Sequence, residues 1–415
     1  MSLTSRNLIF ITSNCNRRRT YGGLAPGEAD FTISLSRATS DPSQIVSIDG
    51  YGMDDFLKKF RRCLMKSTSD HHANICYLDD SNSNYYYDGS NAILTGTEGD
   101  VMVYFPEFWY KCETSTDNHK IHISTSQING YYHSPASLVG AYKAYNEGIS
   151  TLRSLSEVNR TTSLTIDQFY KYARVRGKGF HLIDYMQHRT IAWMFYTRYK
   201  NTDSQSICGT GDSSNTGILN GTTNGLGITD TTTLSAANDS NRLVNFLGIE
   251  GCWGYIYEFI EGIHSNGNDN AVIAYDKPDL VNDSLDNYEY NNEYSYLQSN
   301  FTLPTLRKLN DGYLYGYIKD IWGGDYGDMT IAEKNNSSSY SEEHQYYCDY
   351  GYVNPSSTRI FTRSYDYAVS YGGVSYLYGS WDSNSYYSFV GSRLAFDGTI
   401  VETSVADFKA ISNWR

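Results

Sequence analysis

The sequence predicts an α+β fold in which a small core carries long loop insertions. Two N-terminal capping boxes predict helices, one formed by Thr165 and Gln168 and the other by Asp184 and Gln187. Short runs of β-branched and aromatic residues before and after these helices predict strands. Long stretches rich in Gly, Ser, Thr and Asn separate them, and such stretches predict surface loops because they cannot build a core.

Length and local composition predict two parts. A chain of 415 residues exceeds one ordinary core, and the character of the sequence changes near residue 95. We therefore expect a small N-terminal module over residues 1–95 and a larger domain over 96–415. Within the module, the apolar residues between Met53 and Leu64 have the spacing of an amphipathic helix. The polar, Tyr-rich stretch 79–89 predicts a loop or hairpin tip.

The elements of the larger domain follow in order along the chain. Strand patterns occur at 101–105, 108–112, 120–124, 246–262, 359–363, 373–376 and 392–396. The two helices cover about 165–177 and 184–200, and both are expected to pack on the sheet with one apolar side. The polar stretches 201–241 and 266–300 predict loops.

Charge and hydropathy exclude some functions. The formal net charge is −13, which argues against a nucleic-acid partner because phosphate binding needs clustered Lys and Arg. No apolar run approaches the length of a membrane span, so we expect no membrane insertion. The apolar stretch 8–11 is shorter than the core of a signal peptide.

The seven cysteines indicate neither a zinc site nor a disulfide framework. They are scattered, odd in number and never spaced Cys-x-x-Cys. We expect mostly buried free thiols, no metal and no cofactor. A calcium loop at 80–84 is not favoured, because the sixth-position glycine and the closing glutamate are missing.

The segment from Arg363 to Phe389 has the composition of a binding surface. It contains seven tyrosines and seven serines, together with glycine and asparagine but no lysine or glutamate. Tyrosine supplies rigid amphipathic contact area, and Ser, Gly and Asn supply adaptable hydrogen bonds. The side chains that we expect to contact a ligand are Tyr365, Tyr367, Val369, Tyr371, Tyr376, Tyr378, Ser380, Trp381, Ser385, Tyr386, Tyr387 and Phe389.

Some of these side chains are expected to face inward. A strand over 374–378 would bury alternate side chains, so about a third of the set is expected to pack against the core. On a strand, Tyr386 and Tyr387 point to opposite faces. The alternative interpretation is that the tyrosines pack the interior or a subunit interface rather than a ligand.

Three blocks of the sequence resemble the formylglycine-generating-enzyme type of C-type lectin fold. The block 177–193 resembles the family's Gly-x-Arg-Leu-Pro-Thr-Glu helix entry. The block 247–259 resembles its Gly-Asn-Val-Trp-Glu-Trp region, and Arg363 followed by 391–394 resembles its closing Arg-Gly-Gly-Ser and Gly-Phe-Arg-Leu motifs. The resemblance implies a lectin-type scaffold whose supporting residues are Gly251, Gly254, Glu258, Arg363, Gly391 and Arg393.

Within that fold, the chain resembles the variable proteins of diversity-generating retroelements over roughly residues 100–400. In that family, a C-terminal segment is rewritten at adenines, and Asn-type codons then reach Tyr, Ser, Asp, Gly, Phe and Val. Most side chains between Tyr365 and Phe389 fit this set, whereas Trp381 does not. The variable segment would then span about 360–390.

The resemblance implies a non-catalytic binding protein. A phage tail-fibre or surface adhesin component would recognise a bacterial surface protein or glycan. The N-terminal module would attach it to other virion or surface-structure subunits, with a homo-oligomer as a further option. Its location would be the virion tail or a cell surface, after synthesis in the cytoplasm.

Two alternatives stay open. An oxidative enzyme of the formylglycine-generating type would need a cysteine pair near the end of the domain or a cluster of metal-binding histidines. Only Cys348 lies in the last part of the chain, and His181, His188, His264 and His344 show no ligand spacing. Glu250 and Glu258 could in principle form an acid–base pair, but hydrogen bonding within loops is the commoner role. A structural fibre protein of fixed specificity is the other alternative.

Overall fold

The structure is a computed structural model. It describes residues 29–148, 150–211, 218–232, 243–254, 256–266, 270–273, 307–308, 314–321, 323, 332–335, 344–353, 358–364 and 371–415. Within these residues strands dominate and helices are few, which confirms the α+β class.

A five-stranded antiparallel sheet begins the described chain. Its order is β2-β1-β7-β6-β8. The strands are β1 (Phe31–Ser36), β2 (Val46–Gly50), β6 (Phe108–Thr114), β7 (Asn118–Ser124) and β8 (Tyr132–Ser134). Alternate residues of β1 are buried, as expected for a strand with one face on a core. The predicted strands near 108–112 and 120–124 are confirmed.

A seven-stranded sheet combines strands from early in the described chain with strands close to its C-terminus. Its order is β12-β24-β9-β5-β3-β4-β25. The strands are β3 (Arg61–Ser69), β4 (His72–Tyr77), β5 (Asp100–Phe105), β9 (Ser137–Gly140), β12 (Phe180–Leu182), β24 (Leu394–Asp397) and β25 (Thr399–Glu402). The predicted strand at 101–105 is therefore central, between β3 and β9.

This pairing replaces the expected boundary at residue 95. β3 and β4 precede that position, yet they pair with β5 and with β25 near the C-terminus. β1 likewise pairs with β7. Residues 31–77 thus belong to two sheets that they share with the rest of the chain, because β1, β3 and β4 each pair with a strand beyond residue 95 as well as with a neighbour inside the stretch.

The predicted helix between Met53 and Leu64 forms only in part. Helix α2 spans Met53–Leu57, and β3 begins at Arg61. Residues 62–67 of β3 are continuously buried, and both edges of this strand have neighbours. Hydrogen bonds to two strands override the local helical spacing, since apolar periodicity over one or two turns does not distinguish the two states.

The third large sheet contains nine strands. Its order is β17-β16-β15-β21-β22-β20-β18-β19, and β23 pairs with β15 in parallel. The strands are β15 (Tyr257–Asn266), β16 (Asn270–Ile273), β17 (Arg307–Lys308), β18 (Leu314–Ile321), β19 (Ala332–Asn335), β20 (Tyr350–Val353), β21 (Thr358–Arg363), β22 (Leu377–Trp381) and β23 (Val390–Gly391). Two small hairpins are β10 (Tyr145–Glu147) with β11 (Thr151–Arg153), and β13 (Asn245–Phe246) with β14 (Ile249–Glu250).

The strand predicted at 373–376 lies one step further along the chain. Residues 373–376 form turns, and β22 begins at Leu377. The amide of Val374 donates to Ser204 Oγ over 3.0 Å, and that of Ser375 donates to Asp349 Oδ2 over 2.6 Å. Because side chains satisfy these amides, no strand partner is needed there.

Both predicted capping boxes are present. Helix α3 (Ile166–Arg174) is capped by Thr165 and Gln168, and α4 (Tyr185–Tyr199) is capped by Asp184 and Gln187. Helix α4 is buried on nearly every side, rather than on the one side that the sequence predicts. The shorter helices are α1 (Pro42–Ile45), α5 (Ser204–Cys208) and α8 (Val405–Ala410), with the 3₁₀ turn η1 (Asn224–Leu226).

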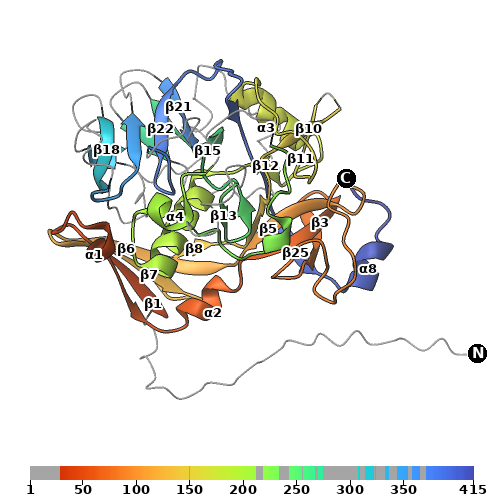
Figure 1. The fold of residues 1–415 in the computed structure, drawn as a ribbon, viewed down its shortest axis with the longest axis horizontal. Coiled ribbons are helices and arrows are strands. Elements are labelled where there is room, and N and C mark those ends of the chain that lie inside the picture. The colour runs from red at the N-terminus through yellow and green to blue at the C-terminus, as the bar shows by residue number, and fades with distance from the viewer. Residues whose placement is uncertain are drawn as a thin grey trace, which may run out of the picture.

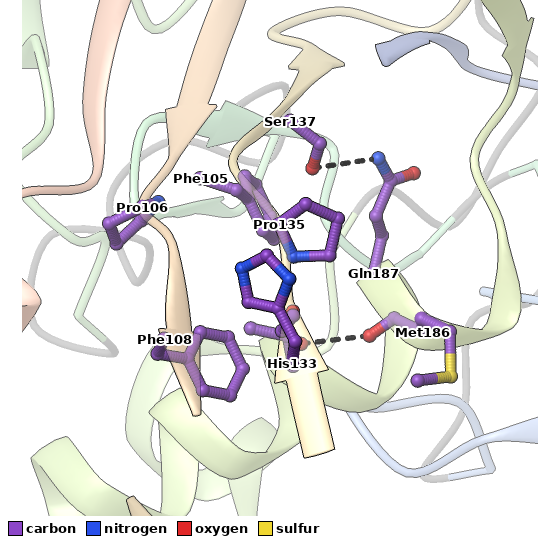
Figure 2. Close-up of a pocket in the computed structure, with 10 residues that line it drawn as sticks. Phe105, Pro106, Phe108, His133, Pro135, Ser137, Met186 and Gln187 are labelled. Atoms are coloured by element: carbon purple, nitrogen blue, oxygen red, sulfur yellow. Dashed lines mark hydrogen bonds between the residues drawn. The ribbon is translucent and has the colours of Figure 1, made fainter. Parts of the chain in front are cut away.

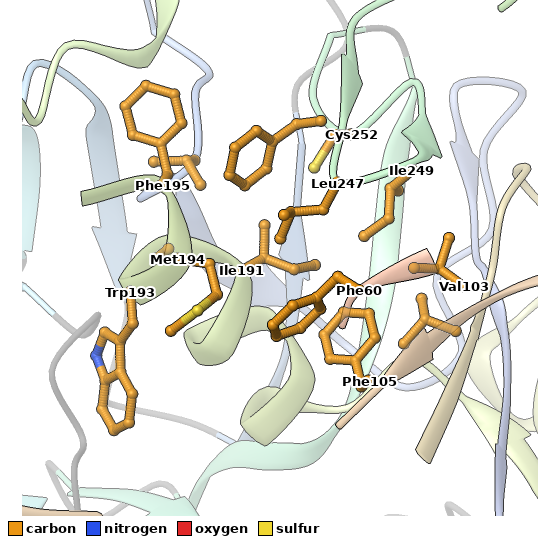
Figure 3. Packing of buried hydrophobic residues seen from close by; sticks show 14 of the residues in the cluster. Phe60, Val103, Phe105, Ile191, Trp193, Met194, Phe195, Leu247, Ile249 and Cys252 are labelled. Atoms are coloured by element: carbon orange, nitrogen blue, oxygen red, sulfur yellow. The ribbon is translucent and has the colours of Figure 1, made fainter. Parts of the chain in front are cut away.

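Helix α4 is buried because it lies between two sheets. Figure 1 shows it in the middle of the molecule, with β15, β21 and β22 on one side and β1, β6 and β7 on the other. Figure 3 shows the packing around it, where Ile191 and Met194 of α4 face Phe60, Phe105 and Leu247. None of the described helices is both long and apolar enough to cross a bilayer.

Candidate ligand-binding surface and its buried anchor

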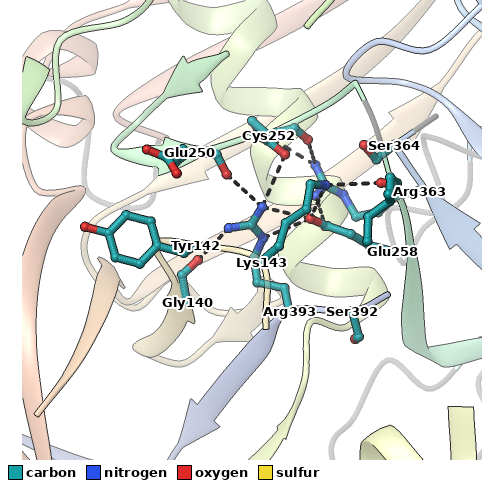
Figure 4. A network of polar contacts seen from close by, with 12 residues as sticks. Gly140, Tyr142, Lys143, Glu250, Cys252, Glu258, Arg363, Ser364, Ser392 and Arg393 are labelled. Atoms are coloured by element: carbon teal, nitrogen blue, oxygen red, sulfur yellow. Dashed lines mark hydrogen bonds and ion pairs between the residues drawn. The ribbon is translucent and has the colours of Figure 1, made fainter. Parts of the chain in front are cut away.

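The buried carboxylate of Glu258, on β15, has three cationic partners. Its Oε1 accepts hydrogen bonds from Lys143 Nζ and from Arg393 Nη2, both over 2.8 Å. Its Oε2 accepts from Arg363 Nη1 over 2.5 Å. All four side chains are almost completely inaccessible to solvent. Figure 4 shows this group, which we call the Glu258 anchor.

The two guanidinium groups use their remaining donors on backbone carbonyls. Arg363 Nη2 donates to Cys252 O over 2.7 Å. Arg393 donates to Gly140 O and Glu250 O, each over 2.9 Å. A planar guanidinium with its donors occupied in this way is held in one orientation. The anchor is therefore a fixed arrangement and not a mobile ion pair.

Burial and charge set the protonation of the anchor. Burial alone would raise the pKa of Glu258, but Arg393, Lys143 and Arg363 outweigh it and hold this pKa well below its usual range. Burial lowers the pKa of Lys143 to about 7, against the opposing effect of the Glu258 carboxylate. Glu258 is therefore ionised at neutral pH.

His188 on α4 completes the surroundings of Arg363. Arg363 Nε lies 3.1 Å from His188 Nδ1, an arrangement in which the histidine accepts. Burial, reinforced by the charge of Arg363, lowers the pKa of His188 well below its ordinary value. A neutral His188 thus supports Arg363 through Nδ1, while its Nε2 is buried without a hydrogen-bond partner.

The anchor holds both ends of the Tyr-rich segment. Arg363 is the last residue of β21, and Arg393 comes just before β24. Gly391 on β23 is paired with Glu258 itself. The two glycines of the neighbouring block, Gly251 and Gly254, have positive φ angles of 59° and 93°, a conformation that glycine adopts readily. The structure thus brings together the six scaffold residues that the resemblance implies.

A cluster of aromatic rings, most of them from the segment between these ends, forms what we call the aromatic surface. It comprises Tyr352, Tyr378, Trp381, Tyr387 and Phe389, all of them half-buried or exposed. Trp381 packs on Tyr378 and Tyr387 with ring centroids 5.2 and 5.6 Å apart. Tyr387 stacks on Phe389 at 5.0 Å, and Tyr352 stacks on Tyr378 at 4.8 Å. Such contacts hold the rings in place while one side stays accessible.

Buried rings support the aromatic surface from below. Tyr257 of β15 contacts Trp381 edge-on at 4.7 Å, and it packs on Tyr376 and Tyr378. Tyr376 is itself buried, and its hydroxyl lies 3.3 Å from that of Tyr257. Of the expected contact residues, Tyr376 is therefore one of those that face inward, because the turn at 373–376 directs its ring into the core.

The other expected contact residues have different positions. Tyr386 is 63% exposed and Tyr387 is 41% exposed. Both lie in a loop rather than on a strand, so the opposite-face expectation does not apply to them. Tyr371 is half-buried against Tyr350, and Ser380 and Ser385 are half-buried. Three further predicted residues lie outside the described residues, namely Tyr365, Tyr367 and Val369.

Sequence reasoning missed two contributors. Lys143 is a lone lysine in an otherwise apolar stretch, which is a weak signal for a buried ion pair. Tyr352 lies outside the Tyr-rich segment and reaches the aromatic surface only because β20 pairs with β22. Glu250 is not part of an acid–base pair with Glu258 in this geometry, since its carboxylate accepts from the amides of Gly221 and Thr223.

The described cysteines, which exclude Cys15, are all buried and unbridged, in agreement with the expectation of free thiols. Burial raises the pKa of Cys208 to about 12, so little of this thiol is ionised at neutral pH.

A separate cavity of about 240 Å³ lies between the β5–β6 junction and α4, where Ser137 and Gln187 form part of its lining (Figure 2). Neither feature includes residues of the aromatic surface.

Comparisons with known proteins give no further assignment. A scan against models of protein families found no match, and neither did a search of curated proteins.

Proposed function

We propose that this chain is a non-catalytic receptor-binding protein of the kind diversified by retroelements, with a C-type lectin-like fold of the formylglycine-generating-enzyme type. It would act as a phage tail-fibre or surface adhesin component. One observation carries the proposal: a segment rich in Tyr and Ser is held at both ends by the Glu258 anchor while its aromatic rings stay partly accessible.

The anchor supports this function because the residues that stabilise the fold differ from the exposed residues that would contact a ligand. Arg363 and Arg393 make their hydrogen bonds to Glu258, to His188 and to backbone carbonyls, all outside the segment between them. Exposed side chains such as Tyr386 contribute little to folding, so exchanging them changes the surface and leaves the core intact. Diversified binding proteins need this separation.

The ligand class follows from the chemistry of the surface. Rigid aromatic rings bury area with little loss of side-chain entropy, and neighbouring serines offer hydrogen bonds. A protein or a glycan on a bacterial surface fits such a surface. Affinity differences between variants are expected mainly in the dissociation rate. The N-terminal part of the chain would attach the protein to other subunits of the particle.

Sequencing the coding region with its genomic neighbourhood tests the proposal. We expect a near-copy of the codons for residues 360–395, beside a reverse-transcriptase gene, that differs from the coding copy mainly at adenines. Independent isolates should then differ at exposed positions such as 386 and 387 and agree at Arg363 and Arg393. Absence of any near-copy, or differences spread evenly over anchor and surface codons, would overturn the retroelement assignment and favour a binding or fibre protein of fixed specificity.

A further inference from the structure

The cavity of Figure 2, which we call the junction pocket, lies where two paired segments of the chain pass from one sheet to another. Phe105 ends β5 and pairs with Ser137 of β9 in the seven-stranded sheet. Phe108 begins β6 and pairs with Ser134 of β8 in the five-stranded sheet. The connections from β5 to β6 and from β8 to β9 each begin with a proline, which has no amide hydrogen to donate across the gap.

The fold holds the walls of the junction pocket in place. Met186, Gln187 and Thr190 of α4 line one side of it. The side chain of Gln187 is fixed by two hydrogen bonds, since its Oε1 accepts from the amide of Asp184 over 3.2 Å and its Nε2 donates to Ser137 Oγ over 3.1 Å (Figure 2). A pocket formed in this way exists before a ligand binds, as is usual for small-molecule sites.

The lining of the pocket is half apolar and half polar. Of the ten residues that line it, five are apolar, among them Phe105, Phe108 and Pro135. The other five carry hydroxyl, amide or imidazole groups, and none of the ten is Lys, Arg, Asp or Glu. A buried anion needs a cation or several donors to offset its lost hydration, so this lining favours a neutral ligand that has both apolar and polar surface.

Two of the polar groups suit a hydroxyl group on the ligand. Ser137 Oγ accepts from Gln187, so its own hydrogen can be donated to a ligand. Thr190 Oγ1 donates to the carbonyl oxygen of Met186 over 2.8 Å, so its lone pairs can accept from a ligand. An alcohol both donates and accepts hydrogen bonds and can therefore use both groups, whereas an ether or a ketone can use only the donor.

His133 lies at the exposed edge of the pocket and is held by two neighbours. Its ring is stacked on Trp109 with the centroids 4.9 Å apart. Its Nε2 lies 2.7 Å from Glu107 Oε1, so Nε2 carries the hydrogen and Nδ1 remains for a further hydrogen bond. The side chain of His133 is 47% exposed, so a ligand can extend past it into the solvent.

The size of the pocket limits the ligand to one ring. Its volume of about 240 Å³ exceeds the roughly 150 Å³ that hold a benzene molecule and lies below the range of about 300–1,000 Å³ for sites of drug-sized compounds. We propose that the junction pocket binds the terminal neutral pyranose ring of a glycan. An apolar C–H face of the sugar would pack on Phe108 and Pro135, and its hydroxyl groups would bond to Ser137 and Thr190. The glycosidic linkage would leave the pocket past His133. This site goes beyond the proposed function, because none of its residues belongs to the Tyr-rich segment.

Ligand-observed NMR tests the site. Saturation-transfer difference spectra are recorded for the full chain with the methyl glycosides of glucose, galactose, mannose and N-acetylglucosamine, each titrated to about 10 mM. We expect at least one glycoside to bind with a dissociation constant of about 1–10 mM. Cyclohexanol, a ring of similar size with a single hydroxyl group, should bind at least about fivefold more weakly than that glycoside. Absence of binding by every glycoside, or equally tight binding of cyclohexanol, would overturn the proposal.

Two variants test whether the sugar occupies this pocket. Ser134→Phe, on the edge strand β8, should fill the pocket and abolish binding of the glycoside. His133→Ala removes one hydrogen-bonding group and part of the wall, so it should weaken binding about three- to tenfold. Because His133 is exposed, its replacement should leave the midpoint of thermal unfolding unchanged, and this variant tests the site even if Ser134→Phe does not fold.

His122→Ala is the matched control. His122 lies on β7 of the same sheet, and its Nε2 also contacts a glutamate, Glu113, at 3.3 Å, but it does not line the pocket. This variant should bind the glycoside as the unaltered chain does. Equal weakening by the two histidine variants would overturn the proposal. So would loss of binding in Tyr386→Ser together with full binding by His133→Ala, a result that assigns the sugar to the aromatic surface and leaves the proposed function in place.

Discussion

Arg363 and Arg393 donate to opposite oxygens of one buried carboxylate, that of Glu258. They are the residues that flank the Tyr-rich segment, so a single side chain on β15 fixes where that segment begins and where it ends. Gly391 adds a backbone pairing to the same residue. The consequences of this arrangement for stability, pH dependence and binding can each be measured.

Glu258→Gln should strongly destabilise the protein. The substitution leaves three buried cations without their common carboxylate, and breaking a buried ion pair from one side costs about 3–5 kcal/mol of unfolding free energy. The measurement is urea-induced unfolding followed by tryptophan fluorescence. The control is Glu113→Gln, which breaks a surface pair with Lys111 worth about 0–1 kcal/mol. Equal effects of the two substitutions would show that the anchor contributes no more than a surface pair.

Lys143 should make stability depend on pH above neutrality. Burial lowers its pKa from 10.5 to about 7 in the folded protein. Below pH 7 the lysine is charged in both states, and the cost of burying the charge is fully present. Between about pH 7 and 10 the unfolded chain holds one more proton, so the unfolding free energy rises with pH by at most about 1.4 kcal/mol per unit.

The comparison with Lys143→Met isolates this contribution. Other groups titrate in the same range, but they do so in both proteins and cancel in the difference. The stability of the unaltered chain relative to Lys143→Met should therefore increase between pH 7 and pH 9.5. A flat or falling difference would mean that Lys143 keeps its charge, held by the Glu258 carboxylate 2.8 Å away.

Local signals predicted the helices and several strands of this fold. Each capping box, at Thr165 and at Asp184, is formed by residues close together in the sequence, so it can be recognised without the fold. Both helices begin there. The boundary expected at residue 95 fails because pairing between distant strands leaves no local signal. Residues 399–402 pair with residues 72–75, and nothing in either stretch indicates the other.

The residues of the Glu258 anchor could be predicted from the sequence where they belong to a recognisable motif. Arg363 and Arg393 come from motifs that the sequence displays, whereas Lys143 comes from a stretch without one and meets Glu258 only in three dimensions. The burial of Tyr376 was equally hidden, because it depends on Ser204 and Asp349 holding the preceding turn. Composition alone therefore identified the segment but not which of its rings face the solvent.

Gly391→Ala should destabilise the protein although glycine and alanine are close in size. A methyl group at this position would lie 2.7 Å from the carbonyl oxygen of Thr161 and 2.6 Å from Ile256 Cδ1. Overpacking of this kind costs about 1–3 kcal/mol, measured by urea-induced unfolding. Gly225→Ala is the control, because nothing lies within 4 Å of its added methyl group. Similar stability of the two variants would show that β23 shifts easily away from its neighbours.

Tyr386→Ser should separate binding from folding. Tyr386 is 63% exposed, so its replacement is expected to change the unfolding free energy by no more than about 0.5 kcal/mol. Tyr376→Ala removes a buried ring nearby and should cost about 3–5 kcal/mol, as for other large aromatic truncations. Thermal and urea unfolding of the two variants measure this contrast.

Binding is then measured with the same exposed variant. Fluorescently labelled protein is applied to a panel of bacterial strains, and the strain that binds the unaltered chain is used for comparison. Tyr386→Ser should weaken this binding through faster dissociation, whereas Tyr51→Ser, which alters a 69% exposed tyrosine outside the segment, should leave it unchanged. If Tyr386→Ser binds normally but no longer assembles into its parent particle, the tyrosines serve packing between subunits. Loss of binding with the fold intact is the result that a displayed recognition surface requires.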